Sequence, residues 1–133
     1  MFVRVCSSVF AVILLAVAST IAASASGKIE RKILKQSELA GKPDTLVIMA
    51  ELLAHPGAVL PKHTHPGDEF LYVLKGGTTR SDDGKTQRLP SGASLHFPRG
   101  KVHGGFVVTG DNPIRVLTVH IVDKGKPLVI PAQ

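Results

Sequence analysis

The sequence predicts an all-β fold, a sandwich or barrel built from short strands. Short apolar runs recur at intervals of roughly ten residues after the first quarter of the chain. The 13 glycines and 9 prolines stand mainly between these runs, where turns are expected. No stretch beyond residue 25 has the spacing of a useful amphipathic helix. With 133 residues, the chain has room for one domain.

The first 25 residues are interpreted as a secretory signal peptide. Arg4 supplies the positive start, and residues 9–17 form an apolar core that is short for a membrane span. Ala23-Ser24-Ala25 matches an A-x-A cleavage site, so we expect cleavage after Ala25 and a periplasmic or secreted protein. An uncleaved N-terminal anchor is the alternative, because the apolar stretch continues weakly through Ile21.

Residues 26–133 are then expected to form a single domain with its barrel core at about 45–123. The only cysteine, Cys6, leaves with the signal, so an apolar core or a metal must hold the fold without a disulfide. The positive charges are scattered and form no basic run, which argues against nucleic acid as a partner. A small molecule is the expected partner, with no membrane contact after cleavage.

The first half of the domain predicts few long elements. Residues 27–34 alternate loosely, and residues 36–41 are typical of a turn or a short helical turn. Residues 46–53 favour a strand over a helix, because a helix here would have only about two turns between flanking prolines. A brief strand at 58–60 and a longer one at 69–75 follow.

The second half begins with a hairpin, because Asp82-Asp83-Gly84 is a strong turn signal between two strand-like runs. Further apolar runs predict a short strand ending at Pro98, two longer strands and a tail with at most one edge strand. The expected strands are 78–81, 85–89, 95–97, 102–109, 114–122 and 128–130.

Three potential metal ligands lie close together in the chain: His63, His65 and Glu69. The two histidines are two residues apart and point to the same face of an extended strand. Glu69 follows a turn and begins the next strand. Two imidazoles and a carboxylate from neighbouring strands suit a first-row divalent metal. A fourth ligand must come from elsewhere, and His103, in a loop that enters a strand, is the best partner.

These residues resemble the two motifs of the cupin superfamily. The pattern G-x5-H-x-H-x3-E-x6-G fits from Gly57 to Gly76, and G-x5-P-x-G-x2-H fits from Gly92 to His103. The chain is therefore similar to small single-domain cupins of type 2, which are quercetin-dioxygenase-like. It departs from the family at Val107, where the second motif usually has an asparagine, so any polar contact of that asparagine is in doubt.

The resemblance implies a double-stranded β-helix, or jelly-roll barrel, with one metal inside. The implied ligands are His63, His65, Glu69 and His103. The implied cofactor is a divalent transition metal, namely iron, manganese, nickel, copper or zinc. The resemblance also implies a homodimer, with residues 28–35 as a candidate for exchange between the two copies.

Two functions from different classes are expected. In the first, the protein is an exported metal-dependent dioxygenase that cleaves a small organic compound. In the second, it is a non-catalytic periplasmic cupin that binds a small molecule or the metal itself. No catalytic side chain is assigned beyond the metal ligands, because the sequence has no nucleophile elbow and no phosphate-binding loop.

The remaining histidines carry weaker expectations. His120 shares a strand face with Thr118, and this face could be the lumen, with His120 beside the ligands or the substrate, or the outside. His96 could face either way, with packing as its default role, and His55 is expected in a solvent-exposed turn. Tyr72 is three residues after Glu69, so strict alternation points it away from the metal as a packing residue.

Overall fold

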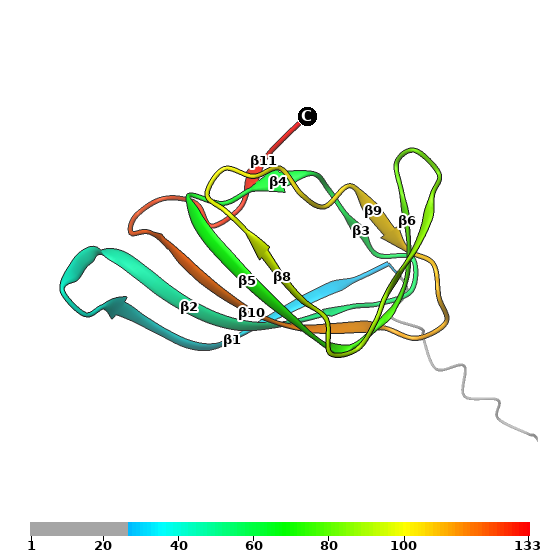
Figure 1. Ribbon diagram of the computed structural model, residues 1–133, viewed down its shortest axis with the longest axis horizontal. Coiled ribbons are helices and arrows are strands. Elements are labelled where there is room, and N and C mark those ends of the chain that lie inside the picture. The colour runs from blue at the N-terminus through cyan, green and yellow to red at the C-terminus, as the bar shows by residue number, and fades with distance from the viewer. Residues whose placement is uncertain (1–26) are drawn as a thin grey trace, which may run out of the picture.

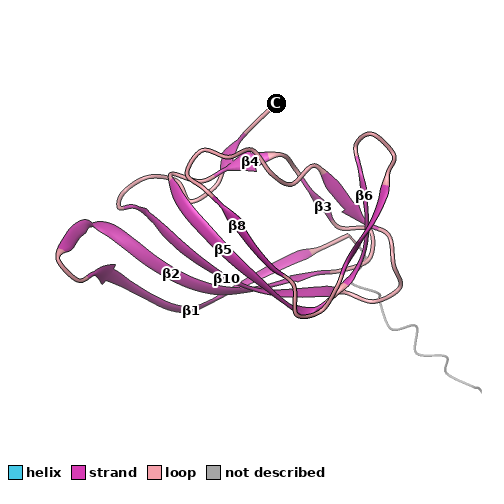
Figure 2. Ribbon diagram, in the orientation of Figure 1, coloured by secondary structure: helices cyan, strands magenta, loops and turns pink. Residues whose placement is uncertain are grey.

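The structure is a computed structural model, and it describes residues 27–133. All regular secondary structure in this range is strand, which confirms the predicted all-β class (Figure 2). The predicted signal over residues 1–25 lies outside the described residues. Within 27–133 there is no helix with the length and apolar character needed to cross a membrane.

The strands form three antiparallel sheets that curve around a common lumen, as expected for a double-stranded β-helix (Figure 1). The largest has the order β1-β2-β10-β5-β8, the second β3-β9-β6-β7, and a small third sheet pairs β11 with β4. The strands are β1 (Ile29–Leu39), β2 (Lys42–Ala54), β3 (Val59–Leu60), β4 (His63–Thr64), β5 (Gly67–Lys75), β6 (Gly77–Ser81), β7 (Thr86–Leu89), β8 (Ser94–Phe97), β9 (Phe106–Val108), β10 (Ile114–Asp123) and β11 (Ile130–Pro131).

Strand β10 lies between β2 and β5 and connects the core to the ligand cluster. Its alternate residues are buried, as period-two patterning requires. Ile114 and Val116 belong to the hydrophobic core, together with Ala58, Val73 and Val108. Further along the same face the buried residues become polar, at Thr118 and His120. One face of one strand therefore contributes to both the apolar core and the polar end of the lumen.

The prediction of a turn over residues 36–41 is wrong. Strand β1 continues to Leu39, and the chain reverses at Ala40 and Gly41, where Gly41 has a φ of 75°. The strand has few apolar residues and is exposed along almost its whole length, so it lacks the periodicity that reveals a strand. Strand β2 also begins earlier than expected, whereas the strand interpretation of residues 46–53 is confirmed.

The strand expected over residues 102–109 is reduced to Phe106–Val108. Gly104 and Gly105 both have positive φ, which ends the extended conformation before the strand. A side chain at Gly104 would place its Cβ 2.4 Å from the carbonyl oxygen of Pro61. This close approach keeps the loop that carries His103 against the segment that carries His63.

The last strand is β11, which overlaps the edge strand expected at residues 128–130. Ile130 pairs with Thr64 and Pro131 with His63, so the C-terminal tail closes one side of the ligand segment. In the single chain described, β1 pairs with β2 of the same chain. The homodimer with exchange of residues 28–35 therefore stays a prediction.

At Gly67, the backbone of the paired strand β10 lies so close to β5 that there is no room for a side chain. A Cβ at this position would lie 2.0 Å from the carbonyl oxygen of Ile121 and 2.6 Å from the Cα of Val122. Both are backbone atoms, which cannot move aside as a flexible side chain can. Gly67 lies between His65 and Glu69, so a shift of its backbone would also move two of the predicted ligands.

We predict that Gly67→Ala lowers the free energy of unfolding by about 2 kcal/mol or more, because overpacking against backbone forces the strands apart. Urea denaturation measures the loss. The matched control is Gly110→Ala, where the nearest atom to the new Cβ is 3.7 Å away. Equal losses in the two variants would show that the close approach at Gly67 contributes nothing.

Candidate metal centre

Four histidines and one glutamate converge at one end of the lumen. They come from strands β4, β5 and β10 and from the loops after β4 and before β9. The structure brings together all four ligands implied by the sequence and adds a fifth residue from β10. The five are His63, His65, Glu69, His103 and His120. All are buried except His103, whose side chain is 9% exposed.

Backbone pairing fixes His63 beside His103. The two residues form an isolated antiparallel bridge. The amide of His63 donates to the carbonyl of His103 at 2.9 Å, and the amide of His103 donates to the carbonyl of His63 at 3.0 Å. Residues 40 positions apart in the chain are therefore held together by main-chain bonds, independently of their rings.

Each of the three predicted histidine ligands donates its Nδ1 hydrogen to a backbone carbonyl. The acceptors for His63, His65 and His103 are the carbonyl oxygens of Pro61, Leu128 and Lys101, respectively. A carbonyl oxygen can only accept, so Nδ1 holds the proton and a neutral ring presents the lone pair of Nε2. The ring centroids are 4.3 to 4.9 Å apart. The three rings are thus oriented as histidine ligands of a metal usually are.

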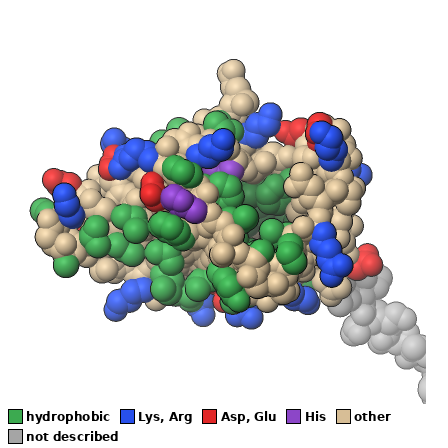
Figure 3. Space-filling view, viewed as in Figure 1, with side chains coloured by type: hydrophobic (Ala, Val, Ile, Leu, Met, Phe, Trp, Pro, Cys, Tyr) green, Lys and Arg blue, Asp and Glu red, His purple; other side chains and the backbone are tan. Residues whose placement is uncertain are grey.

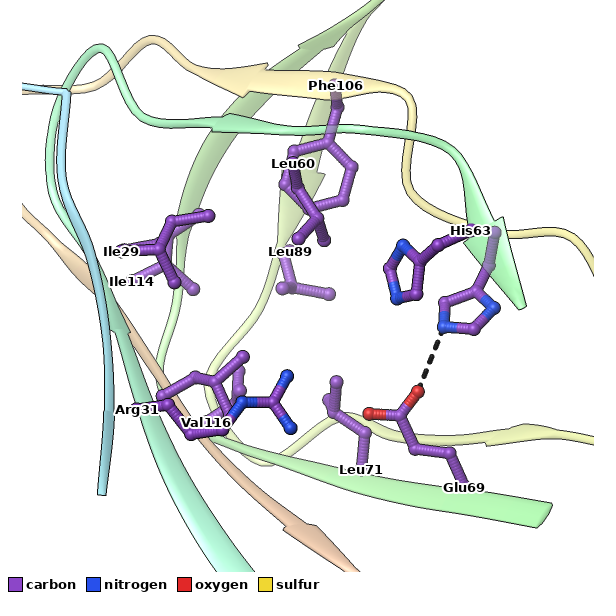
Figure 4. Close-up of a pocket in the computed structure, with 13 residues that line it drawn as sticks. Ile29, Arg31, Leu60, His63, Glu69, Leu71, Leu89, Phe106, Ile114 and Val116 are labelled. Atoms are coloured by element: carbon purple, nitrogen blue, oxygen red, sulfur yellow. Dashed lines mark ion pairs between the residues drawn. The ribbon is translucent and has the colours of Figure 1, made fainter. Parts of the chain in front are cut away.

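The carboxylate of Glu69 faces two of these nitrogens. Its Oε2 lies 3.1 Å from Nε2 of His65 and 2.9 Å from Nε2 of His103, the contact dashed in Figure 4. The His65 contact has the geometry of a hydrogen bond, whereas the His103 contact is not aligned for one. In neutral rings, lone pairs would face the negative oxygen, so a proton or a metal cation must lie between them. Ligands at about 2.1 Å on adjacent corners of an octahedron are about 3.0 Å apart, which agrees with both separations. The donor set therefore fits a divalent metal.

The electrostatics keep Glu69 ionised. Burial raises the pKa of its carboxyl, but the rings of His103 and His65 lower the pKa more, and the result is far below the usual value. Burial lowers the pKa of His103, but Glu69 outweighs this and the net pKa is raised. Burial lowers the pKa of His63. The centre thus offers an ionised oxygen donor at neutral pH, whereas metal binding competes with protonation of His103, whose pKa is raised.

His120 is the residue whose facing the sequence left open, and the structure places it in the lumen. It is fully buried, and its Nε2 lies 3.8 Å from Oε1 of Glu69. Neither ring nitrogen has a hydrogen-bond partner among residues 27–133. A buried imidazole without partners requires an explanation. With His65 and Glu69 it forms a second group of donor atoms spaced closely enough to share one ion.

The other residues singled out in the sequence lie away from this centre. His96 is on the outer face, where its ring stacks on Phe70 at 4.5 Å and its Nε2 contacts Asp68. His55 is half-buried and pairs with Glu30, so its expected solvent exposure is wrong. Tyr72 is 47% exposed and points outward, as alternation predicted.

An apolar pocket of about 610 Å³, including its open mouth, leads to the centre. Figure 3 shows a hollow in this face with apolar side chains in it. His63, Glu69 and His103 form part of the wall, and the remainder is apolar except for Arg31 (Figure 4). The apolar residues are Ile29, Leu52, Ala54, Leu60, Leu71, Leu89, Phe106, Ile114 and Val116.

Comparison with known families agrees with this geometry. The family model for the Cupin domain matches residues 51–120, which include all five residues of the centre. The chain belongs to the cupin family. This confirms the resemblance seen in the two motifs, and the antiparallel double-stranded β-helix is the fold that accompanies it. No curated protein matches the sequence.

Several solved structures are similar to this cupin. The polyketide cyclase RemF from Streptomyces resistomycificus has 25% identity and a TM-score of 0.58, covering 81% of this chain and 75% of the cyclase. A cupin domain from Bordetella pertussis has 19% identity and a TM-score of 0.55, covering 72% and 95%. The DMSP lyase DddQ from Ruegeria pomeroyi has 21% identity and a TM-score of 0.56, covering 81% and 56%. The last two show the fold alone.

We predict that His120 makes the metal-free protein less stable in acid. Burial lowers the pKa of His120 from 6.5 to about 4, so the unfolded chain binds more protons between these values and stability falls as pH falls through this window. From pH 7 to pH 5 the loss from this residue is about 2 kcal/mol. Urea unfolding at both pH values, after chelation of metal, should show a smaller loss in His120→Gln.

The control is His96→Gln, which changes an exposed histidine on the outer face and should keep the pH dependence of the wild type. If His120→Gln loses as much stability as the wild type between pH 7 and pH 5, His120 is not buried in its neutral form.

Proposed function

We propose that this cupin is an exported metal-dependent enzyme that acts on a small organic compound, with oxygen-dependent cleavage as the first reaction to test. One observation carries the proposal. Three of the residues that could hold the metal, His63, Glu69 and His103, also form part of the wall of the apolar pocket. A molecule in the pocket therefore contacts the metal centre directly.

A purely structural metal is less consistent with this arrangement. A structural zinc site is closed by its four ligands and keeps no position for another molecule. Here three of the candidate ligands, His63, Glu69 and His103, themselves line the pocket. Their contact with the pocket supports a site that exchanges a ligand with solution.

The pocket wall and the residues of the centre would have different roles. The apolar wall removes water from a bound molecule and leaves its polar end to the metal centre. The carboxylate of Glu69 and the ring nitrogens can take or give a proton, whereas the wall outside the centre contributes only Arg31 as a polar side chain. A bound divalent iron, manganese, nickel, copper or zinc would supply Lewis-acid or redox chemistry.

Similarity to RemF supports an enzymatic role. RemF is a polyketide cyclase, and its structure resembles 81% of the present chain at 25% identity. The fold itself does not specify the reaction, because function depends on the site.

A non-catalytic role in binding a small molecule or the metal is the second candidate. It is favoured by the scarcity of acid–base groups in the pocket wall beyond the centre. Either role is compatible with export, which we propose from the composition of residues 1–25. The two roles differ in turnover, so they are separated by assay of the metal-loaded protein.

The expected result is about one divalent transition metal per chain in protein recovered from the periplasmic or secreted fraction. Elemental analysis measures it, followed by oxygen uptake with a panel of small aromatic and enolic compounds. Glu69→Gln should lower metal affinity roughly a hundredfold, because it removes the only negative donor. His96→Gln is the matched control and should bind metal normally.

Absence of metal from the native protein would contradict the enzyme proposal. Metal without oxygen uptake, but with saturable binding of a panel compound, would favour the non-catalytic role. Recovery of the protein only from the cytoplasm would contradict export.

A further inference from the structure

We propose that Arg31 recognises a carboxylate, so that the pocket takes a small organic acid with an apolar middle and a polar end at the metal centre. This inference rests on the proposed function, because it assumes that the pocket holds the ligand of that centre. It adds the chemical class of the ligand and a residue that selects it. Arg31 lies outside the residues matched by the Cupin domain family model.

The register of β1 places Arg31 on the inner face of the sheet. Arg31 pairs with Leu52, and both line the pocket. Ile29, two residues earlier, pairs with Ala54, and both of these line it as well. Because side chains alternate along a strand, Lys32 points to the opposite face, where its partner in the register is Glu51. The positively charged Arg31 therefore shares the inner face with the aliphatic side chain of Leu52.

The guanidinium of Arg31 points into the pocket and faces the side that carries Glu69 (Figure 4). Within the described range, Arg31 makes no hydrogen bond or ion pair. Arg99 and Arg115 differ from it, since Arg99 forms a bidentate pair with Asp123 and Arg115 forms one with Glu51. Arg31 therefore has free donors directed at the space where a ligand would lie.

Arg31 is exposed to solvent, although part of its side chain lies against the pocket wall. Burial lowers the pKa of the Arg31 guanidinium and Glu69 raises it, with a net lowering. The group nevertheless remains charged, as arginine does in proteins. A bound anion would give the donors of Arg31 charge-assisted hydrogen bonds beside the apolar wall. Glu69 is not the partner of these donors, because its carboxylate contacts the rings of His65 and His103.

The net charge of the pocket wall with a metal bound also favours an anionic ligand. Glu69 is the only acidic residue in the wall, and a divalent metal would more than offset its charge. Arg31 adds a second positive group to the pocket wall. It also lines a neighbouring pocket together with Pro61 and Lys62. An organic acid would thus meet positive charge at both ends and aliphatic side chains between them.

A carboxylate fits better than a phosphate. The planar guanidinium matches the two oxygens of a carboxylate with two parallel hydrogen bonds. Apart from the metal-centre histidines, Arg31 is the only basic residue lining the pocket, so a doubly charged phosphate would retain unmatched charge in an apolar wall. The proposed ligand is therefore a monoanionic carboxylic acid at the Arg31 end.

The test uses nickel-loaded protein and a probe series whose metal-binding end is fixed. The probes are the monohydroxamates of succinic, glutaric and adipic acid, each with its neutral methyl ester. The hydroxamate binds the metal, and the other end carries either a carboxylate or an uncharged ester at a graded distance. Isothermal titration calorimetry gives both the nickel affinity and the probe affinities.

Wild-type protein should bind at least one acid about tenfold or more tightly than its ester, as expected for a charge-assisted pair. Arg31→Gln should reduce this preference to within about twofold, while its affinities for nickel and for the esters stay as in the wild type. Arg31→Lys should keep part of the preference. The matched control is Lys32→Gln, which removes the same charge from the outer face of the same strand and should keep the full preference.

The inference is overturned if the wild type does not distinguish acids from esters, or if Arg31→Gln distinguishes them as well as the wild type does. A failure of the proposed function looks different: the wild type would not bind nickel, or the esters would not bind to the nickel-loaded protein.

Discussion

The metal centre depends on three hydrogen bonds from imidazole Nδ1 atoms to backbone carbonyls. The carbonyls of Pro61, Lys101 and Leu128 fix the rings of His63, His103 and His65. Each bond determines the tautomer and the ring direction, so that the lone pair of Nε2 is the free donor. Two of the carbonyls lie two residues before their histidine, and the third belongs to the C-terminal segment, whose strand β11 pairs with β4.

This arrangement explains why a carboxylate and an uncapped imidazole can lie in the interior. Glu69 is buried, yet its oxygens face ring nitrogens at separations that suit ligands of one metal ion. His120, on the central strand β10, has no partner of its own in the described part of the chain and approaches the other oxygen of Glu69. Without a cation these groups would be a cost to folding, because unpaired buried polar atoms destabilise a protein. The apolar pocket beside them is lined in part by three of the donor residues, His63, Glu69 and His103.

The motif spacings predicted the fold class, and they also predicted that His63, His65, Glu69 and His103 converge, as they do in the structure. His63 and His65 must share a strand face, and the glycines of the motifs require turns at fixed places. The facing of His120 could not be predicted, since Arg115 and Asp123 bracket aliphatic residues on the opposite face and both faces look partly apolar. Only pairing with β2 and β5 decides which face is inside. Arg31 was missed for a related reason: β1 is polar and exposed, so its inner face becomes evident only from its register with Leu52.

Preoriented Nε2 atoms and the carboxylate of Glu69 are the groups that would hold one metal ion at the end of the pocket. Anomalous diffraction from crystals of the nickel-loaded protein tests it most directly. We expect a single strong peak about 2.0–2.2 Å from Nε2 of His63, His65 and His103 and from an oxygen of Glu69, with the three Nδ1–carbonyl bonds intact. A peak bonded to Nδ1 atoms, or a peak only at surface residues, would contradict it.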